Sequence, residues 1–444
     1  MVLDLVVFWR NQLDQSTPCV STELNKKEII WGSPRTRRQE PDQVERTGMD
    51  WKSAKKNDQG LLEVPKSWLH SHYYEALNIL FRFENSLRVF VYVVLKSQLN
   101  EKWSEASFSM GQANAQSIKG VASKRIKQAD SFGYLGYDIT APLMHLTSGE
   151  LVEIITCDAY WPIFKGFFRG NKEIIKNKLL EIGTIRNSLA HFRPIKSDDI
   201  ELIKQNSRHT LIGVERCLSN LFSQRIRVPT NTDEEWYKSI STIGTEYIST
   251  ILYHSEDEQW INIQLKFTSP ILSKQELTNT FYSYNLAKLI TPNILKESDI
   301  ISKYITYISE YISYPSIDDK WDIHVSKDVN FVFDKKVLIE NASDISDAIR
   351  GIVSLTTEEC ELLQNDHLAR GKILKSENVS AYWSQPEDSK GSWTYHHDRL
   401  TVPYEPLHPD EYWGQKLYNS SDVVASSRRY PWMPDDISDQ ELLW

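Results

Sequence analysis

Three side chains near the end of one predicted helix are suited to phosphate chemistry. Arg186, Asn187 and His191 lie in the segment NKEIIKNKLLEIGTIRNSLAHFRP, residues 171–194. Histidine accepts and donates protons near neutral pH, and arginine offers a permanently charged fork of donors to phosphate oxygens. Asn187 and His191 share one helix face because they are four residues apart, whereas Arg186 is rotated from His191 by roughly 140° on an ideal helix. One such helix can bind a phosphate and present an imidazole, but only two of them around a two-fold axis could enclose a substrate.

The same segment predicts the helix that positions these residues. Asn171 is a good N-cap, and Glu173 lies in the first turn, where its charge suits the helix dipole. Pro194 disfavours helical geometry at the residue before it, so the helix should end near His191. Apolar residues at three- and four-residue spacing predict a buried stripe, which consists of Ile174, Ile175, Leu179, Ile182, Ile185 and Leu189.

The run RNSLAH, residues 186–191, resembles the Arg-x4-6-His signature of the HEPN superfamily in its common form Arg-Asn-x3-His. Three further segments, in the same order, look like the Swt-type branch of that superfamily: WLHSHYYEALNILFRFENSLRVFVYVVL, APLMHLTSGELVEIIT and residues 161–168. The resemblance covers roughly residues 65–222. It implies an antiparallel α-helical bundle and a metal-independent endoribonuclease that needs no cofactor.

The resemblance also implies a role for each residue of the motif. His191 would be the general base or acid while the ribose 2′-hydroxyl attacks phosphorus, and Arg186 would stabilise charge on the phosphoryl oxygens. Asn187 would orient His191 or donate to the same phosphate. The expected products are a 2′,3′-cyclic phosphate and a 5′-hydroxyl, so DNA should be spared. The implied assembly is a homodimer through the bundle, and the implied partner is RNA.

Several readings of function remain open. The first is a bacterial toxin or anti-phage ribonuclease, which the joint presence of Arg186, Asn187 and His191 favours. The second is a catalytically inert HEPN scaffold that binds RNA or nucleotide, and the third is a protein-interaction module. Without the resemblance, Arg186 and His191 would read as ordinary capping of a helix C-terminus.

Other charged residues could support this site. Glu84 and Arg88 form an i,i+4 pair on a long helix predicted from Pro65 to about Leu95, with apolar residues on more than one side. The pair is either a surface ion pair or a support for the Arg186/His191 site. The segment QSIKGVASKRIKQAD, residues 116–130, should be helical, and its cations are either a solvated face or contacts to the RNA backbone. The candidate RNA-binding residues are Lys119, Lys124, Arg125, Lys127 and Arg193.

Composition and charge suggest several domains. The chain has 444 residues, which exceeds one ordinary core. We predict a mainly α protein with an arm at 1–60, a helical bundle at 61–227 with an insertion at 101–146, an α+β domain at 228–380, and an aromatic, proline-rich wrapping tail at 381–444. Thr147 and Glu150 should form a capping box.

The net charge of −9 is unevenly distributed. Residues 61–230 contain 22 Lys and Arg against 16 Asp and Glu, whereas residues 231–444 contain 19 against 35. The acidic half could compete with RNA for the basic bundle through a flexible linker at 228–235, until a trigger bound to that half releases it. The alternative is that the acidic surface only confers solubility.

The C-terminal half gives weaker signals. Helices are expected at 234–253, 273–290 and 294–313, with two more over 343–374. Strands are expected at Ile261–Phe267, in WDIHV and VNFVF, and in KVLIE, residues 336–340. His396, His397, Asp398 and His408 have no spacing typical of a closed metal site, so no metal is expected.

The sequence also suggests a compartment. The four cysteines are scattered and form no metal-type pair, which suits a reducing cytoplasm. The longest apolar run, Val89–Leu95, is far shorter than the roughly 20 residues that a membrane span needs. A cytoplasmic protein without a membrane partner is therefore expected.

Overall fold

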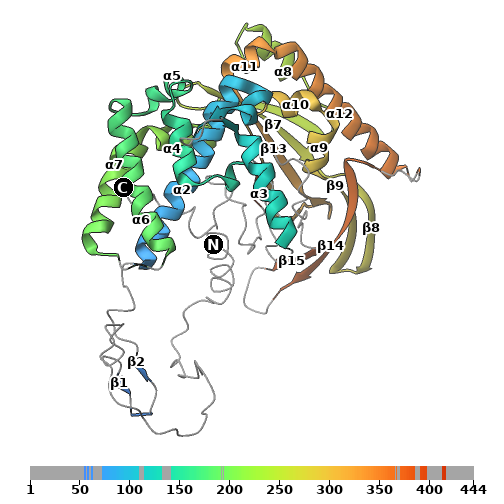
Figure 1. Ribbon diagram of the computed structural model, residues 1–444. Coiled ribbons are helices and arrows are strands. Elements are labelled where there is room, and N and C mark those ends of the chain that lie inside the picture. Colours follow the sequence, from blue (N-terminus) through green and yellow to red (C-terminus); the bar gives the residue numbers. More distant parts are fainter. Residues whose placement is uncertain are drawn as a thin grey trace, which may run out of the picture.

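The structure of the protein, a computed structural model, has a helical N-terminal region and an antiparallel, β-rich α+β C-terminal region, as the sequence predicts (Figure 1). The residues that it describes are 55–56, 58–59, 62–63, 73–109, 115–132, 142–191, 193, 195–365, 367, 371–385, 391–397 and 413–416. Most of the expected N-terminal arm, residues 1–60, therefore lies outside the described residues.

Helices dominate the first part of the chain after a small hairpin of β1 (Lys55–Lys56) and β2 (Leu62–Glu63). The elements that follow are α2 (Tyr73–Leu99), η2 (Asn100–Glu105), β3 (Ser107–Phe108), β4 (Gln116–Ser117), α3 (Ile118–Phe132), η3 (Pro142–His145), α4 (Ser148–Thr156), α5 (Trp161–Phe164), η4 (Lys165–Phe167), α6 (Lys172–Ala190) and α7 (Ser197–Phe222). Helices α6 and α7 run antiparallel, because Glu181 bonds to Asn206 while Lys178 contacts His209. The capping box of Thr147 and Glu150 is confirmed.

Helix α2 is the centre of the helical region and is covered on more than one side. Every residue from Val89 to Lys96 is buried. Phe90 contacts the rings of α5 and η4, and Tyr92 contacts Trp103 of η2. The core around α2 also includes Trp260, Tyr307 and Val332, which come from the C-terminal sheet. The predicted contact on a second side of this helix is thus partly a contact with the α+β region.

Helix α6 forms for the reasons that its sequence gives. The side chain of Asn171 accepts a hydrogen bond from the Ile174 amide at 2.9 Å, and the helix ends at Ala190 with His191 as its C-cap. The stripe is buried at Ile175, Leu179, Ile182, Ile185 and Leu189. Ile174 is the exception, since 48% of it is exposed. The prediction that it joins the stripe was wrong because Ile175 occupies the core side of that turn.

The C-terminal region contains two main sheets. The six-stranded sheet has the order β16-β10-β13-β7-β6-β5, antiparallel except for β10 and β16. Its strands are β5 (Ile226–Arg227), β6 (Ile248–His254), β7 (Trp260–Thr268), β10 (Tyr307–Ile312), β13 (Ser326–Asp334) and β16 (Trp413–Lys416). The four-stranded sheet has the order β15-β14-β9-β8, with strands β8 (Ile271–Thr278), β9 (Phe281–Leu289), β14 (Leu374–Ser384) and β15 (Ser392–His397).

A hairpin and five helices complete this region. They are β11 (Ser316–Ile317), β12 (Ile323–His324), α8 (Glu235–Ser241), α9 (Thr291–Glu297), α10 (Asp299–Tyr304), α11 (Lys335–Glu340) and α12 (Ala342–Gln364). In β7, the predicted alternation is confirmed: Ile261, Ile263, Leu265 and Phe267 share a core with α12. Trp260 faces the core of α2 instead, so the six-stranded sheet lies between α12 and the helical region (Figure 1).

Two of the expected helices do not form over their full range, because strands replace part of the first and most of the second. Residues 234–253 contain only the short α8, after which the chain becomes β6, bonded between β5 and β7. Residues 273–290 form the hairpin of β8 and β9. The expected helix at 294–313 is also broken, into α9, α10 and strand β10. Cross-strand pairing outweighs local periodicity here, which is common because strand preference depends on tertiary context.

Two further predictions were wrong about the type or the number of elements. KVLIE is not a strand but helix α11, because Asp334 caps it by accepting a hydrogen bond from the Lys336 amide at 2.9 Å. The two helices expected over 343–374 are the single helix α12 followed by the start of β14. The strands expected in WDIHV and VNFVF are present as β12 and β13.

The start of the expected linker and the described strands of the expected tail pair with other strands. Residues 226–227 pair with β6, and the Val228 amide donates to the Leu252 carbonyl at 2.9 Å. The linker at 228–235 is therefore not a flexible joint at its start. Trp383 and Trp393 lie opposite each other in β14 and β15, so residues 381–384 and 392–397 belong to a sheet, whereas most of the expected tail after His397 lies outside the described residues.

These contacts predict that the helical region depends on the sheet. A chain ending at Arg227 would lose β6 and would expose the α2 core to water where Trp260, Tyr307 and Val332 pack. We expect a loss of at least about 3–5 kcal/mol of stability, the cost of removing one large core side chain. Thermal unfolding followed by circular dichroism measures it, with a chain ending at Lys416 as the control. A soluble 1–227 chain that unfolds cooperatively at the full-length midpoint would contradict the expectation.

Candidate active site at the end of helix α6

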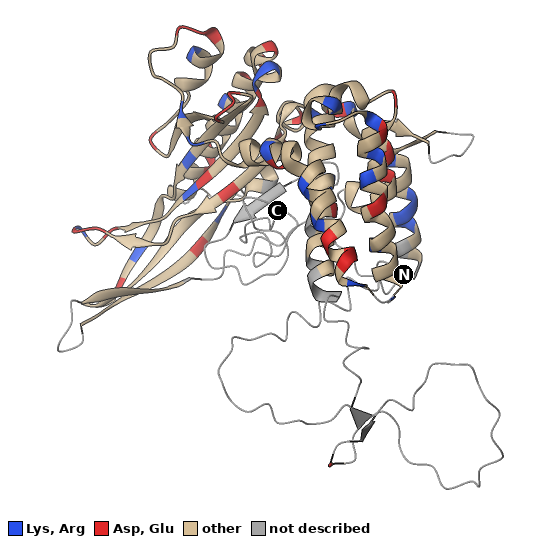
Figure 2. Cartoon of the chain, turned by 90° about the vertical axis from the view of Figure 1, so that its left-hand side faces the viewer, with Lys and Arg blue, Asp and Glu red and all other residues tan. Residues whose placement is uncertain are grey.

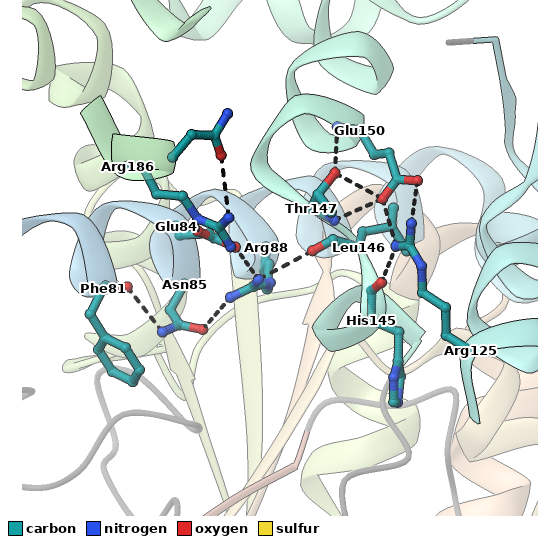
Figure 3. A network of polar contacts seen from close by, with 11 residues as sticks. Phe81, Glu84, Asn85, Arg88, Arg125, His145, Leu146, Thr147, Glu150 and Arg186 are labelled. Atoms are coloured by element: carbon teal, nitrogen blue, oxygen red, sulfur yellow. Dashed lines mark hydrogen bonds and ion pairs between the residues drawn. The ribbon is translucent and has the colours of Figure 1, made fainter. Parts of the chain in front are cut away.

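The guanidinium group of Arg186 is anchored on α2. Its Nε donates to Oε2 of Glu84 at 3.3 Å, across 102 positions of sequence (Figure 3). Glu84 is 8% exposed, and the side chain of Arg186 is 15% exposed. The site therefore combines an arginine from α6 with a buried carboxylate from the central helix.

Glu84 is shared between two arginines. Its Oε1 accepts from Arg88, which also donates to Oδ1 of Asn85 at 3.0 Å and to the Leu146 carbonyl at 3.2 Å. Arg88 and Glu84 are both mostly buried, so their pair is not the surface ion pair that helical spacing alone would suggest. Of the two, Glu84 contacts Arg186 directly and Arg88 contacts Glu84, which is the arrangement that a supporting role at the site requires.

Asn187 and His191 lie on the exposed side of α6. Oδ1 of Asn187 is 3.5 Å from Nη1 of Arg186, and the His191 amide donates to the Asn187 carbonyl at 3.2 Å. The imidazole of His191 is exposed at the C-cap. Arg193 is exposed too, and its amide donates to the Ser188 carbonyl at 2.9 Å.

The structure thus joins some of the predicted site residues and leaves others apart. Arg186, Asn187, Glu84 and Arg88 form one set of contacts, while no side-chain bond links His191 to that set within the described residues. Arg186 uses Nε and Nη1, so Nη2 has no protein partner among the residues that the structure describes. A donor remains for a phosphate oxygen.

The predicted RNA-binding cations divide into two groups. Lys119, Lys124 and Lys127 are exposed on α3. Arg125 instead turns inward and forms two hydrogen bonds to the Glu150 carboxylate, at 2.7 and 2.8 Å, and a third to the His145 carbonyl. Grouping Arg125 with the three lysines does not match its position in the structure.

Two polar residues near the site were missed as members of it. Glu150 was identified only as part of a capping box, and Asn85 was not singled out. Asn85 follows Glu84 directly and lies three positions before Arg88, which places its amide within reach of that guanidinium. Glu150 lies four residues after Leu146, whose carbonyl accepts from Arg88, so the predicted cap already marked the turn that adjoins the site.

Comparisons with protein-family models, with curated proteins and with solved structures find no match to this chain.

The described residues contain no group of three or more His, Cys, Asp or Glu side chains placed to hold a metal ion. Of the four residues from which no metal site was expected, His408 and Asp398 lie outside those residues, and the ring of His396 stacks on Tyr382. No helix in the described part of the chain is long and apolar enough to cross a membrane.

Charges of both signs alternate along the helices of this region. Figure 2 shows Lys and Arg beside Asp and Glu on the helical bundle and not a continuous basic face. Contacts such as Lys172–Asp158 at 2.6 Å and Lys176–Glu153 at 3.1 Å neutralise part of the positive excess.

Glu84 should matter far more for stability than an ordinary carboxylate. In Glu84→Gln, two buried arginines lose their counter-charge, and we expect a loss of about 3 kcal/mol in the free energy of unfolding. The matched control is Glu153→Gln, which breaks the more exposed pair with Lys176 and should cost at most about 1 kcal/mol. Urea unfolding measures both variants. Equal losses would show that Glu84 does not hold the two arginines.

Proposed function

We propose that the protein is a metal-independent endoribonuclease that cuts RNA by attack of the ribose 2′-hydroxyl. The observation that supports this most is the placement of Arg186. Glu84 holds it by Nε, so the guanidinium has a fixed position, and within the described residues its Nη2 has no partner and is a donor available to phosphate. The same helix ends four residues after Asn187 with an exposed imidazole, His191. The resemblance of RNSLAH to the HEPN signature agrees with this assignment.

The reaction needs a base, an acid and a stabiliser of negative charge. The base takes the proton of the 2′-hydroxyl as its oxygen bonds to phosphorus, and the acid protonates the 5′-oxygen as the P–O5′ bond breaks. Arg186 would stabilise the charge that develops on the non-bridging oxygens. The products are a 2′,3′-cyclic phosphate and a 5′-hydroxyl, and a DNA strand would be inert because it lacks the nucleophile.

One copy of α6 supplies one imidazole, so a two-fold dimer would supply the second. The exposed side of α6 offers a surface for it. Leu180, Asn187 and His191 are separated by seven and four residues, which puts them on one helix face, and Leu180 is 42% exposed. An exposed leucine in line with the site residues suits a contact that would bring two copies of His191 near one axis.

The setting of this activity follows from its chemistry. An enzyme that cuts cellular RNA would act in the cytoplasm, as a toxin or as an anti-phage effector. The α+β region would bind the trigger or regulator. Because its sheet packs directly on the core of α2, a change there could reach the site without a flexible linker. The alternative is an inert RNA-binding protein. In favour of it, the mostly buried Arg186 already has Glu84 as a partner for its charge.

The activity test rests on His191. In EDTA, the purified protein should convert mixed RNA into fragments with 2′,3′-cyclic phosphate ends, and His191→Ala should lower the rate by about 100-fold or more. His209→Ala, another exposed histidine, is the matched control and should cleave normally. Arg186→Ala is a less clean variant because it also leaves Glu84 with one arginine fewer. Cleavage by His191→Ala at the wild-type rate would reject the proposal. The absence of cleavage by the wild-type protein would reject it as well.

The assembly test rests on Leu180. Leu180→Glu should convert a dimer into a monomer and lower activity without changing the unfolding midpoint, because the side chain is exposed in the single chain. Light scattering at micromolar concentration measures the mass. Mixing His191→Ala with Arg186→Ala chains should restore part of the activity if one site takes residues from both copies. A fully active wild-type monomer would contradict the dimer.

A further inference from the structure

The turn between η3 and α4 is held from both sides by arginines. Arg88 of α2 donates to the Leu146 carbonyl at 3.2 Å, and Arg125 of α3 donates to the carbonyl of the preceding residue, His145 (Figure 3). Two consecutive carbonyls therefore bond to guanidinium groups that come from two different helices. Each arginine is therefore held by a contact outside its own helix.

Arg125 is fixed by a set of bonds that leaves it little freedom. Its two terminal nitrogens bond to the two oxygens of Glu150, and Oε2 of Glu150 also accepts from the amide and the hydroxyl of Thr147, at 2.8 and 3.0 Å. Burial alone would raise the pKa of Glu150, but the bonds from Arg125 and Thr147 outweigh burial and lower this pKa. The carboxylate is thus ionised at neutral pH and keeps the arginine in place.

These bonds continue to Arg186 without a break. Arg125 holds the turn, the turn's Leu146 carbonyl holds Arg88, Arg88 shares Glu84 with Arg186, and Arg186 is the residue proposed to meet the phosphate. Each step includes a charged group, and the side chains of Arg88, Glu84 and Arg186 are mostly buried, whereas that of Arg125 is 34% exposed. Charge-assisted contacts of this kind fix geometry. A shift of α3 would move the turn and, through Arg88, the carboxylate that anchors Arg186.

We propose that Arg125 is a positioning residue, which sets the place of Arg186 through the turn of residues 145–147. Its effect on catalysis rests on the proposed ribonuclease function, whereas its effect on Arg186 does not. RNA bound to the exposed Lys119, Lys124 and Lys127 would contact α3, the helix of Arg125. The linked contacts from Arg125 to Arg186, called the relay below, would then couple RNA binding to the site. A direct phosphate contact by Arg125 is disfavoured because it would leave Glu150, whose side chain is 11% exposed, without its counter-charge.

The first arm of the test measures Arg186 itself. Arginine labelled with ¹⁵N gives an Nε–H signal for Arg186, assigned by its loss in Arg186→Lys. Arg125→Lys keeps the charge but not the bidentate fork, and this variant should move the Arg186 signal. Glu150→Gln is a second, independent variant with the same expected result if Arg125→Lys folds poorly. Lys124→Ala should leave the Arg186 signal in place. The signal of Arg350, which lies on α12, should stay in place in both Arg125→Lys and Glu150→Gln.

The second arm measures cleavage. Arg125→Lys should lower kcat by about tenfold or more with KM changed less than twofold, since misplaced catalytic groups slow the chemical step. A raised KM with an unchanged kcat would overturn the proposal, because it would show that Arg125 binds phosphate. An Arg186 signal that stays in place in both Arg125→Lys and Glu150→Gln would overturn it as well. If the wild type does not cut RNA, the proposed function fails, and the signal of Arg186 alone decides on the relay.

Discussion

The protein depends on the burial of one helix. From Val89 to Lys96, α2 presents no side to water, although a helix at a protein surface normally buries only one stripe. Fully burying a Val, Leu or Phe side chain contributes about 1.5–3 kcal/mol, so this segment requires cover on every side. Helices α4, α6 and α7 cover part of it, and the face of the six-stranded sheet with Trp260, Tyr307 and Val332 covers another part. The two regions are one body because they share this core.

The buried polar end of that interface supports the same conclusion. Lys96 is 1% exposed, and its ammonium group donates to the Ser302 carbonyl in α10 at 2.9 Å. Burying an ammonium group is costly unless hydrogen bonds replace its water. The contact therefore requires α10 to stay against the end of α2. A model in which an acidic half swings away on a linker does not fit a boundary built from a shared apolar core and a buried lysine.

The sequence predicted the helical region well because its signals are local. Asn171, Thr147 with Glu150, and the stripe of α6 specify where helices begin and which side is buried, and the structure follows them. In the C-terminal half the decisive contacts are between strands. Most of β8 is exposed, so its sequence has no apolar alternation that would indicate a strand. Strand β6 is stabilised by its pairing with β5 and β7, and this tertiary contact cannot be read from its own sequence. A signal in β9 was available: Tyr282, Tyr284 and Leu286 alternate with period two.

The site shows the same division between local and tertiary information. The spacing of Arg186, Asn187 and His191 follows from one helix, but the bond from Arg186 to Glu84 joins two helices and could not be derived from spacing. Arg125 is more instructive because its orientation was readable. Ile118, Val121 and Ala122 are buried on α3, and Arg125 follows them by seven, four and three residues, whereas Lys124 has such a spacing only to Val121 and Lys127 has it to none of the three.

An arginine on an apolar stripe must meet an acceptor inside the protein, because an unpaired buried charge is too costly. Glu150, predicted to cap the next helix, was the available partner. Buried ion pairs of this kind add little net stability over a well-packed apolar core, but they require a specific geometry. In this protein the mostly buried Arg88 and Arg186 and the partly exposed Arg125 are linked by two carboxylates and one turn. The geometry that these contacts require ends at Arg186, whose Nη2 has no protein partner among the residues that the structure describes.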